Sequence, residues 1–245
     1  MNQQQIVVFT DGASKGNPGP GGWGVIIATP DGQVRELGGG AASTTNNRME
    51  LTGAIQALTH LQAVSGPVAI YTDSTYVIQG IREWIHGWRR RGWKTATGTD
   101  VLNRDLWEEL SRLTAARGAK GIAWHYVRGH VGIPGNERVD VIADSFAVHE
   151  PVSLYDGPAD GYRIQIRHLP DDTTMPARKP GAGSGAKTAA YSYLSVVDGV
   201  PMRHATWAEC EQRVKGRSGA RYKKTMSAAE QSEILRSWNF GPNDV

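Results

Sequence analysis

The strongest constraint on the fold is a change in periodicity within the first 150 residues. Apolar or alternating runs at about 5–12, 22–29 and 33–40 are separated by Gly/Pro/Asn turn signals, which predicts three adjacent antiparallel strands. Helical and strand patterns then alternate, with helices expected at about 46–64, 74–91, 101–117 and 136–149 and strands at 67–72 and 121–127. A strand meander followed by such alternation predicts an α/β fold: a mixed five-stranded sheet flanked by helices.

The composition changes near residue 167. Residues 167–190 are rich in Pro, Gly, Ala and Ser, which is typical of a flexible linker. Beyond them, strands are expected at 191–197 and 220–226 and helices at 206–214 and 227–238, with Thr206 and Glu209 spaced as a capping box. The predicted organisation is a first domain over 1–166, a linker over 167–190 and a small α+β domain over 191–245.

Composition excludes several classes of protein. The sequence has no run of 18 or more apolar residues, and its first residues lack the charged start and apolar stretch of a secretory signal. Cys210 is the single cysteine, so intramolecular disulfides and cysteine-based zinc sites are excluded. We therefore expect a cytoplasmic protein without a membrane partner.

The positive charge is concentrated at the C-terminal end. Residues 1–150 carry fourteen Lys/Arg and fourteen Asp/Glu, residues 151–186 carry four of each, and residues 187–245 carry nine against six. The whole net charge of +3 thus falls in the last segment, which favours a polyanionic partner there, although small asymmetries are often only solvated surface.

Four acidic residues occupy positions where a carboxylate is costly. Asp11 and Asp73 each end a buried apolar run, Glu50 lies in the first turns of an amphipathic helix, and Asp140 follows a Gly-rich loop. Any one of them is most commonly a cap or turn residue. Together, hard oxygen ligands arriving from four separate elements indicate one divided magnesium site.

Several multi-residue motifs in a fixed order resemble type 1 ribonuclease H. They are Asp11-Gly12-Ala13-Ser14 with the following Gly/Pro turn, Thr45-Asn46-Asn47-Arg48-Met49-Glu50-Leu51, Thr72-Asp73-Ser74, and the stretch from Gly129-His130 to Asp140. The resemblance covers about residues 5–166. It implies an endonuclease that hydrolyses the RNA strand of RNA/DNA hybrids and leaves 5′-phosphate and 3′-hydroxyl ends.

The resemblance assigns roles to the acidic residues and to the loop that precedes the last one. The family's four catalytic, metal-binding carboxylates match Asp11, Glu50, Asp73 and Asp140. Two Mg²⁺ ions, for which Mn²⁺ is a possible substitute, would activate a water and stabilise the leaving 3′ oxygen. His130 matches a histidine that assists proton transfer or product departure, a role suited to its ordinary pKa, although a lone loop histidine is usually only solvated. Glu137 matches a residue that contacts the RNA or a metal-linked water.

Reading a hybrid requires contacts to the 2′-hydroxyls of one strand only. By resemblance, Asn17, Asn46 and Asn47 lie at the shallow groove and Thr45 belongs to a pocket for a DNA phosphate, although turn and cap chemistry would also explain these residues. Thr75 occupies a position where bacterial relatives often carry a base-contacting glutamine, so that contact is in doubt.

A basic and aromatic segment lies at 84–94. It contains Trp84, Trp88, Arg89, Arg90, Arg91, Trp93 and Lys94. Such a mixture suits a platform for nucleic-acid backbone, although Trp84 and Trp88 at helical spacing would equally suit a core. The resemblance matches this segment to the family's basic protrusion, which grips the DNA strand. We expect the arginines to contact phosphate and some of the tryptophans to pack beneath them.

The C-terminal segment carries three further motifs, Tyr193-Leu194-Ser195-Val196-Val197-Asp198-Gly199, Thr206-Trp207-Ala208-Glu209-Cys210 with Val214-Lys215-Gly216, and Ala220-Arg221-Tyr222-Lys223-Lys224. They resemble the small hybrid-binding domain also known from viroplasmin, which usually precedes the nuclease in eukaryotic type 1 enzymes. The family's DNA-contacting residues match Trp207, Tyr222, Lys223 and Lys224. A first-strand aromatic matches either Tyr193 or the position of Leu194. Trp207 would also suit a core position after a helix cap.

The function expected from the sequence is therefore a monomeric ribonuclease H whose partner is an RNA/DNA hybrid, with double-stranded RNA as a second partner open to the C-terminal domain. A non-catalytic hybrid-binding protein is the alternative, but it would be expected to lose acidic ligands that are all present here. Transposases and integrases of related fold use a different acidic set and lack the Gly129-His130-Val131-Gly132 loop.

Overall fold

The computed structural model describes residues 5–118, 121–129, 132–170, 172–175, 191–217, 219–225, 227–241 and 244. The chain forms two compact units, Met1–Pro176 and Ala177–Val245. Among the described residues, no helix combines the length and the apolar character needed to cross a bilayer.

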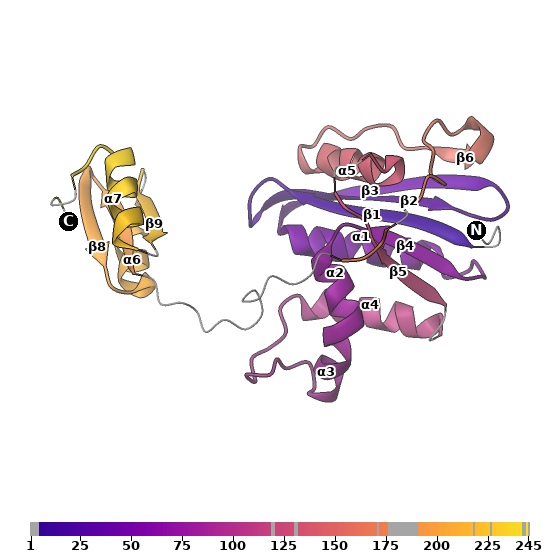
Figure 1. The fold of residues 1–245 in the computed structure, drawn as a ribbon, viewed down its shortest axis with the longest axis horizontal. Helices are drawn as coiled ribbons and strands as arrows, with labels where there is room; N and C mark the ends of the chain where they lie inside the picture. The colour runs from indigo at the N-terminus through magenta and orange to yellow at the C-terminus, as the bar shows by residue number, and fades with distance from the viewer. Residues whose placement is uncertain are drawn as a thin grey trace. The chain divides into compact units, whose positions relative to one another are not determined.

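The first unit is built on a six-stranded sheet in the order β5-β4-β1-β2-β3-β6 (Figure 1). Its strands are β1 (Ile6–Ser14), β2 (Gly19–Ala28), β3 (Gln33–Thr44), β4 (Val68–Thr72), β5 (Ile122–Tyr126) and β6 (Asp156–Pro158). The meander β1-β2-β3 is antiparallel, whereas β4 and β5 run parallel to β1, so the sheet is mixed as predicted. The sixth strand was not predicted: three residues that include a glycine and a proline carry no alternating pattern.

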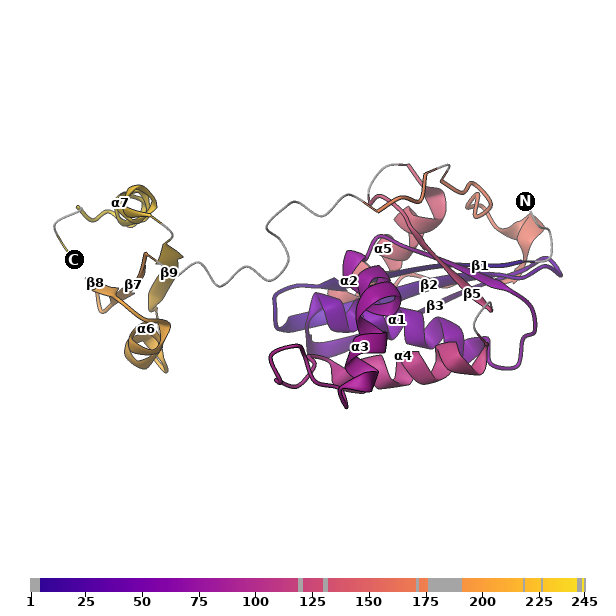
Figure 2. The same ribbon diagram turned by 60° about the horizontal axis from the view of Figure 1, so that its bottom comes forward.

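Helices cover both faces of this sheet (Figures 1 and 2). They are α1 (Asn46–His60), α2 (Thr75–Gln79), a π-helical turn at Gly80–Trp84, α3 (Ile85–Arg90), α4 (Arg104–Ala116) and α5 (Pro134–Ala147), with a 3-10 turn at Ala159–Gly161. The helix expected over 74–91 thus runs without a break from Thr75 to Arg90, with a π-helical turn in its middle, where Gly80 lies against the ring of Trp107.

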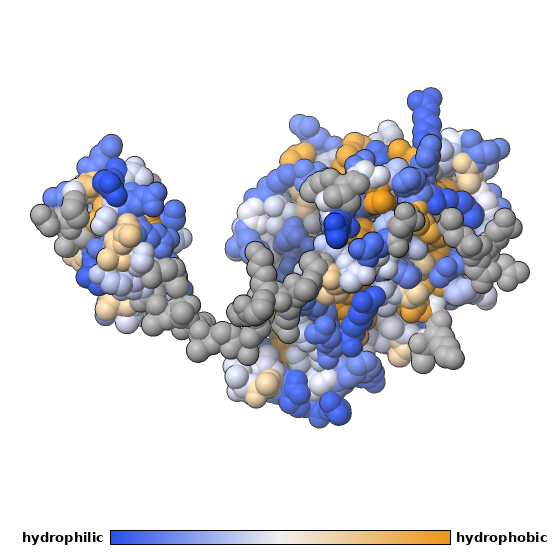
Figure 3. All heavy atoms as spheres, viewed as in Figure 1, coloured by the Kyte–Doolittle hydropathy of each residue, from blue (hydrophilic) through white to orange (hydrophobic). Residues whose placement is uncertain are grey.

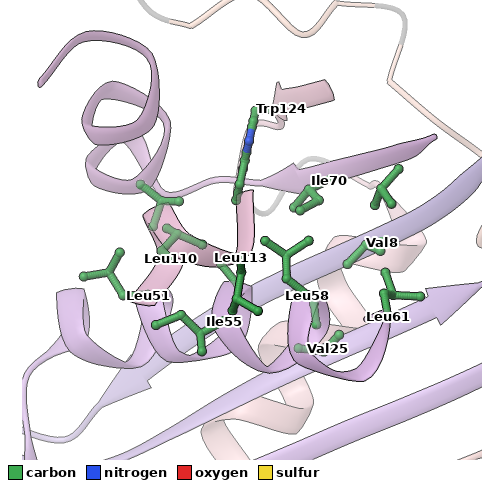
Figure 4. Packing of buried hydrophobic residues seen from close by; sticks show 14 of the residues in the cluster. Val8, Val25, Leu51, Ile55, Leu58, Leu61, Ile70, Leu110, Leu113 and Trp124 are labelled. Atoms are coloured by element: carbon green, nitrogen blue, oxygen red, sulfur yellow. The ribbon is translucent and has the colours of Figure 1, made fainter. Parts of the chain in front are cut away.

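Two hydrophobic cores lie on opposite faces of the sheet. Ile6 and Val8 point into the core under α1 and α4, which Figure 4 shows with Leu58 and Leu110 among its members. Val7 and Phe9 point to the other face, where the core includes Val139 of α5. Because both faces of β1 are covered, the strand reads as a continuous apolar run rather than an alternation.

The start of the segment expected to be a linker lies against the first unit. Leu169 packs on the core beside α5, Met175 packs on the core beside α1, and Arg128 pairs with Asp172 at 3.8 Å. Residues 171 and 176–190 lie outside the described residues, so a flexible linker there stays a prediction.

The second unit is a three-stranded antiparallel sheet with two helices. The strands β7 (Ser192–Val197), β8 (Val200–His204) and β9 (Arg221–Thr225) lie in the order β8-β7-β9, joined by α6 (Trp207–Val214) and followed by α7 (Ala228–Ser237). Thr206 and Glu209 form the predicted capping box at the start of α6. Strand β8 was missed, because the sequence Val-Pro-Met-Arg-His has little strand pattern.

The two helices of this unit pack on small apolar clusters. Cys210 and Val214 of α6 pack with Val197, whereas Ile234 and Leu235 of α7 pack with Leu194. Leu194 and Val197 are three residues apart on β7, so they point to opposite faces of the sheet. Each helix therefore covers a different face.

Candidate active site

Four separate elements bring the predicted carboxylates to one cavity of about 370 Å³. Asp11 lies on β1, Glu50 on the second turn of α1, Asp73 directly after β4 and Asp140 on α5. The cavity is lined by Asp11, Gly12, Ala13, Ser14, Asn46, Glu50, Asp73, Asp140 and Asp144. The sequence-based grouping of the four acidic residues is thus reproduced in space.

A glycine sets the distance between the first two carboxylates. A Cβ on Gly12 would overlap the backbone of Met49 and Glu50, so only glycine lets β1 and α1 approach this closely. That approach places Glu50 beside Asp11.

The cavity disfavours negative charge when no cation is bound. Burial raises the pKa of Asp11 to about 8, with further contributions from the charges of Asp73, Asp140 and Glu50 that outweigh a hydrogen bond from the Gly12 amide. Burial also raises the pKa of Glu50 to about 7, against hydrogen bonds from Ser74 and Asn46. Crowded, poorly hydrated carboxylates of this kind are strained by mutual repulsion, which a divalent cation relieves.

The donor set fits a hard cation, since all four side chains are carboxylates and Mg²⁺ prefers oxygen ligands. Within the described ranges, no three acidic, histidine or cysteine side chains stand as a ready-made metal-binding group. The oxygens of Glu50 accept hydrogen bonds from Ser74 Oγ and from Asn46 Nδ2 at 2.8 Å. Each carboxylate oxygen has a second lone pair, so Glu50 can keep these donors and still face a cation.

Two polar residues that the sequence reasoning missed hold the carboxylates. Ser74, 3% exposed, bonds Glu50 and also caps α2 by accepting from Val77 N. Asn136, in the first turn of α5 and 3% exposed, donates to Asp73 Oδ2 at 3.5 Å, while its own Oδ1 is buried without a described partner. Ser74 carried a signal, since a serine between a strand and a helix is a typical cap; Asn136 depends on a contact across 63 residues.

The other predicted groove residues are placed as follows. Asn17 is exposed in the β1–β2 turn, Thr45 is the residue before α1 and makes no side-chain cap, and Asn47 is half-buried. Thr75 is exposed at the start of α2. Glu137 is exposed and accepts a hydrogen bond from Gly132 N at 3.1 Å, which ties it to the chain two residues beyond His130. His130 itself lies outside the described residues.

The basic and aromatic segment has its aromatic side turned inward. Trp84 and Trp88 belong to a ring cluster with Tyr76 and Trp107, with centroid distances of 5.3–5.8 Å, and Trp88 and Trp93 pack on the core beneath. The exposed cations are Arg89, Arg90, Arg91 and Lys94. Figure 3 shows mostly hydrophilic residues over this end of the first unit, where Figure 1 places α3.

The comparisons with known proteins give separate matches for the first and the second unit. The family model described as RNase H matches residues 3–147, more than half of the chain. The chain belongs to the ribonuclease H family. The model described as the ribonuclease H1 N-terminal domain matches residues 204–231, here at the C-terminal end. This membership implies that the chain is a hydrolase that cuts the RNA of RNA/DNA hybrids endonucleolytically. The family typically requires divalent metal ions.

Individual relatives agree. A ribonuclease H from Cyanothece sp. (strain PCC 7425 / ATCC 29141) is 56% identical over 148 residues, which is 60% of this chain and 92% of the relative. One from Acidovorax sp. (strain JS42) is 54% identical over 140 residues, 57% of this chain and 93% of the relative. The crystal structure of LC9-RNase H1, a type 1 RNase H with the type 2 active-site motif, matches with a TM-score of 0.54 and 32% identity over 65% of this chain and 81% of that one.

The predicted binding residues of the second unit lie on two different faces of its three-stranded sheet. Tyr193, Trp207 and Tyr222 form a row of rings with centroids 5.8 and 5.5 Å apart, and Trp207 and Tyr222 are 41% and 54% exposed. Leu194 is fully buried, so Tyr193 is the aromatic of the first strand that reaches this row. Lys224 is paired with Tyr193 and shares its face, whereas Lys223 is paired with Leu194 and points to the other face.

Proposed function

We propose that this ribonuclease H cuts the RNA strand with two divalent metal ions, Mg²⁺ in the first instance, held by Asp11, Glu50, Asp73 and Asp140. The observation that carries the proposal is the convergence of these four carboxylates on one cavity, with the pKa of Asp11 raised to about 8 by burial and by its acidic neighbours. When bound, the ions supply an activated water and charge stabilisation for the leaving 3′ oxygen, giving 5′-phosphate and 3′-hydroxyl ends.

The residues of this chain position the groups that react. Asp11 has the most buried carboxylate of the four and interacts with the charges of the other three, so it would hold metal ions together with them. Asn136 and Ser74 restrict the rotamers of Asp73 and Glu50, so that the carboxylates are held near one arrangement. The Gly132–Glu137 contact holds the chain two residues beyond His130, the residue we assign to proton transfer or product departure.

Cleavage of a hybrid by the wild type and by Asp73→Asn in Mg²⁺ tests this assignment. We expect the variant to lose cleavage and to retain hybrid binding, because one ligand is neutralised and the fold is unchanged. The exposed Asp160→Asn provides a matched loss of charge and should cleave normally. Full activity of Asp73→Asn would refute the two-metal proposal.

We further propose that the second unit binds the hybrid through the row of Tyr193, Trp207 and Tyr222. Exposed aromatic rings beside a lysine are what stacking on sugars and bases requires, and such contacts are worth about 1–3 kcal/mol per base. The same surface would accept double-stranded RNA. A comparison of hybrid and RNA duplex binding by the wild type and by Trp207→Ala tests both: equal affinities of the variant and the wild type would contradict the assignment.

A further inference from the structure

A lysine outside the four-carboxylate set is tied to the wall of the active-site cavity. Lys15, in the β1–β2 turn, places its Nζ 2.8 Å from both carboxylate oxygens of Asp144. Asp144 is four residues beyond Asp140 on α5, so both point to the same side of the helix, and both line the cavity. The pair joins two elements 129 residues apart in the sequence.

The backbone of Lys15 is held firmly while its charged end is only lightly held. Lys15 N donates to Pro20 O at 2.7 Å across the turn, which fixes the main chain at this point. The side chains of Lys15 and Asp144 are 43% and 50% exposed. An ion pair this exposed contributes only about 0–1 kcal/mol, so another anion can replace Asp144 at little cost.

The substrate of this site brings such an anion. A phosphodiester backbone entering the cavity meets five carboxylates, those of Asp11, Glu50, Asp73, Asp140 and Asp144, and needs positive charge beside them. The two oxygens of Asp144 hold the lysine ammonium as two non-bridging phosphate oxygens would.

We propose that Lys15 binds a phosphate of the RNA strand next to the scissile one, and that Asp144 occupies the place of this phosphate in the free protein. The proposal rests on the proposed function, which puts the scissile phosphate in this cavity. Binding would move Lys15 from Asp144 to the RNA and leave the turn backbone where it is. Lys15 and Asp144 therefore contribute to the affinity and the salt dependence of hybrid binding.

Hybrid affinity tests this in full-length protein, with Ca²⁺ in place of Mg²⁺ and the RNA checked to be intact on a gel. We expect Lys15→Met to weaken binding about fivefold to tenfold and to make the log–log salt slope shallower by about one, because one phosphate contact is lost. Lys15→Arg should restore both values, because arginine also binds phosphate.

Asp144→Asn should tighten binding in the wild-type background, because Lys15 is released, and should do so much less when Lys15 is already Met. Glu109→Gln, which removes a carboxylate paired with Arg112 on the exposed side of α4, measures the effect of charge alone. Unchanged affinity and slope in Lys15→Met, or an equal gain from Asp144→Asn in both backgrounds, would overturn the proposal. Failure of the two-metal assignment would show separately, as cleavage retained by Asp73→Asn.

Discussion

The guanidinium of Arg138 donates to both carboxylate oxygens of Glu36, at 2.7 and 2.8 Å, and so joins α5 to β3 across 102 residues. Glu36 is 3% exposed and also accepts from Tyr155 N and Tyr162 Oη. Asp140 lies two residues beyond Arg138 on the same helix. The network therefore fixes the helix that carries one of the four active-site carboxylates.

Replacing the buried partner should destabilise the fold in a pH-dependent way. Glu36→Gln is expected to lower the free energy of unfolding by about 3 kcal/mol at pH 7, because it breaks a largely buried pair. Burial opposes ionisation of Glu36, but hydrogen bonds from Arg138, Tyr162 and Tyr155 outweigh it and lower its pKa below the ordinary 4.5. The stabilisation is thus present above pH 4.5 and is lost as the pH falls through the lower folded-state pKa. Denaturant unfolding of both proteins from pH 3 to pH 7 should show a gap that closes on the acid side; a constant gap would contradict the role of the charge.

Removing the most buried of the four active-site carboxylates should stabilise the metal-free protein. Asp11→Asn relieves burial and repulsion by three acidic neighbours, so we expect a gain of about 1 kcal/mol or more in chelator at pH 8. Mg²⁺ should raise the melting temperature of the wild type by binding the folded state, and should raise that of the variant far less. Thermal melts with and without Mg²⁺ measure both effects, and an equal Mg²⁺ shift in the two proteins would exclude Asp11 as a ligand.

The glycine before His130 has a steric role. A Cβ on Gly129 would lie 2.7 Å from Asp73 Oδ2, so Gly129→Ala should displace that carboxylate. We expect kcat to fall about 100-fold, as small misplacements of catalytic groups do, with hybrid affinity retained. Single-turnover cleavage and binding isotherms separate the two quantities. Normal kcat would mean that Asp73 tolerates the shift.

The two neighbouring lysines of β9 should differ in their effect on binding. Lys224 shares the face of Tyr193, whereas Lys223 points to the other face. Lys224→Met is expected to weaken hybrid binding and reduce the salt slope by about one, and Lys223→Met serves as the matched control with a smaller effect. The reverse order would place the binding surface on the α7 side of the sheet.

Deleting residues 187–245 should separate binding from chemistry. Each unit has its own core, so the first should fold alone, with an unchanged single-turnover rate on saturating hybrid. Hybrid affinity should fall about 100-fold, because the tethered second site is lost, and repeated cutting should fall with it. Multiple-turnover assays on long hybrids measure this; unchanged affinity and processivity would remove any binding role from the second unit.

The helices and strands that were predicted from the sequence are those whose hydrophobic pattern is local. The apolar run Ile6–Phe9 predicts a buried strand and the apolar stripe of α1 predicts a helix, because burial of one or both faces sets the spacing of the apolar side chains. The strands β6 and β8 were not predicted. Their residues pair with β3 and β7, which lie beside them in the sheets, and their own sequences show little strand pattern.

In the candidate site, too, residues within local patterns were predicted and residues that depend on distant contacts were not. The four carboxylates were predicted because each follows or lies within a recognisable element, but their supports were not. Asn136 with Asp73 and Lys15 with Asp144 are contacts across 63 and 129 residues that exist only once the sheet has brought the elements together. The five-stranded sheet was predicted without the short strand that follows α5, and so the path of the chain after that helix was missed.

That path has a consequence for where this nuclease can be divided. The match to the family model ends at residue 147, yet Glu36 draws two of its donors from Tyr155 and Tyr162. A protein cut at residue 147 would keep the buried carboxylate of Glu36 and lose two of its hydrogen-bond donors. We therefore expect the shortest piece that folds as the intact enzyme does to reach at least to Tyr162, so the end of the family model lies inside the unit of folding.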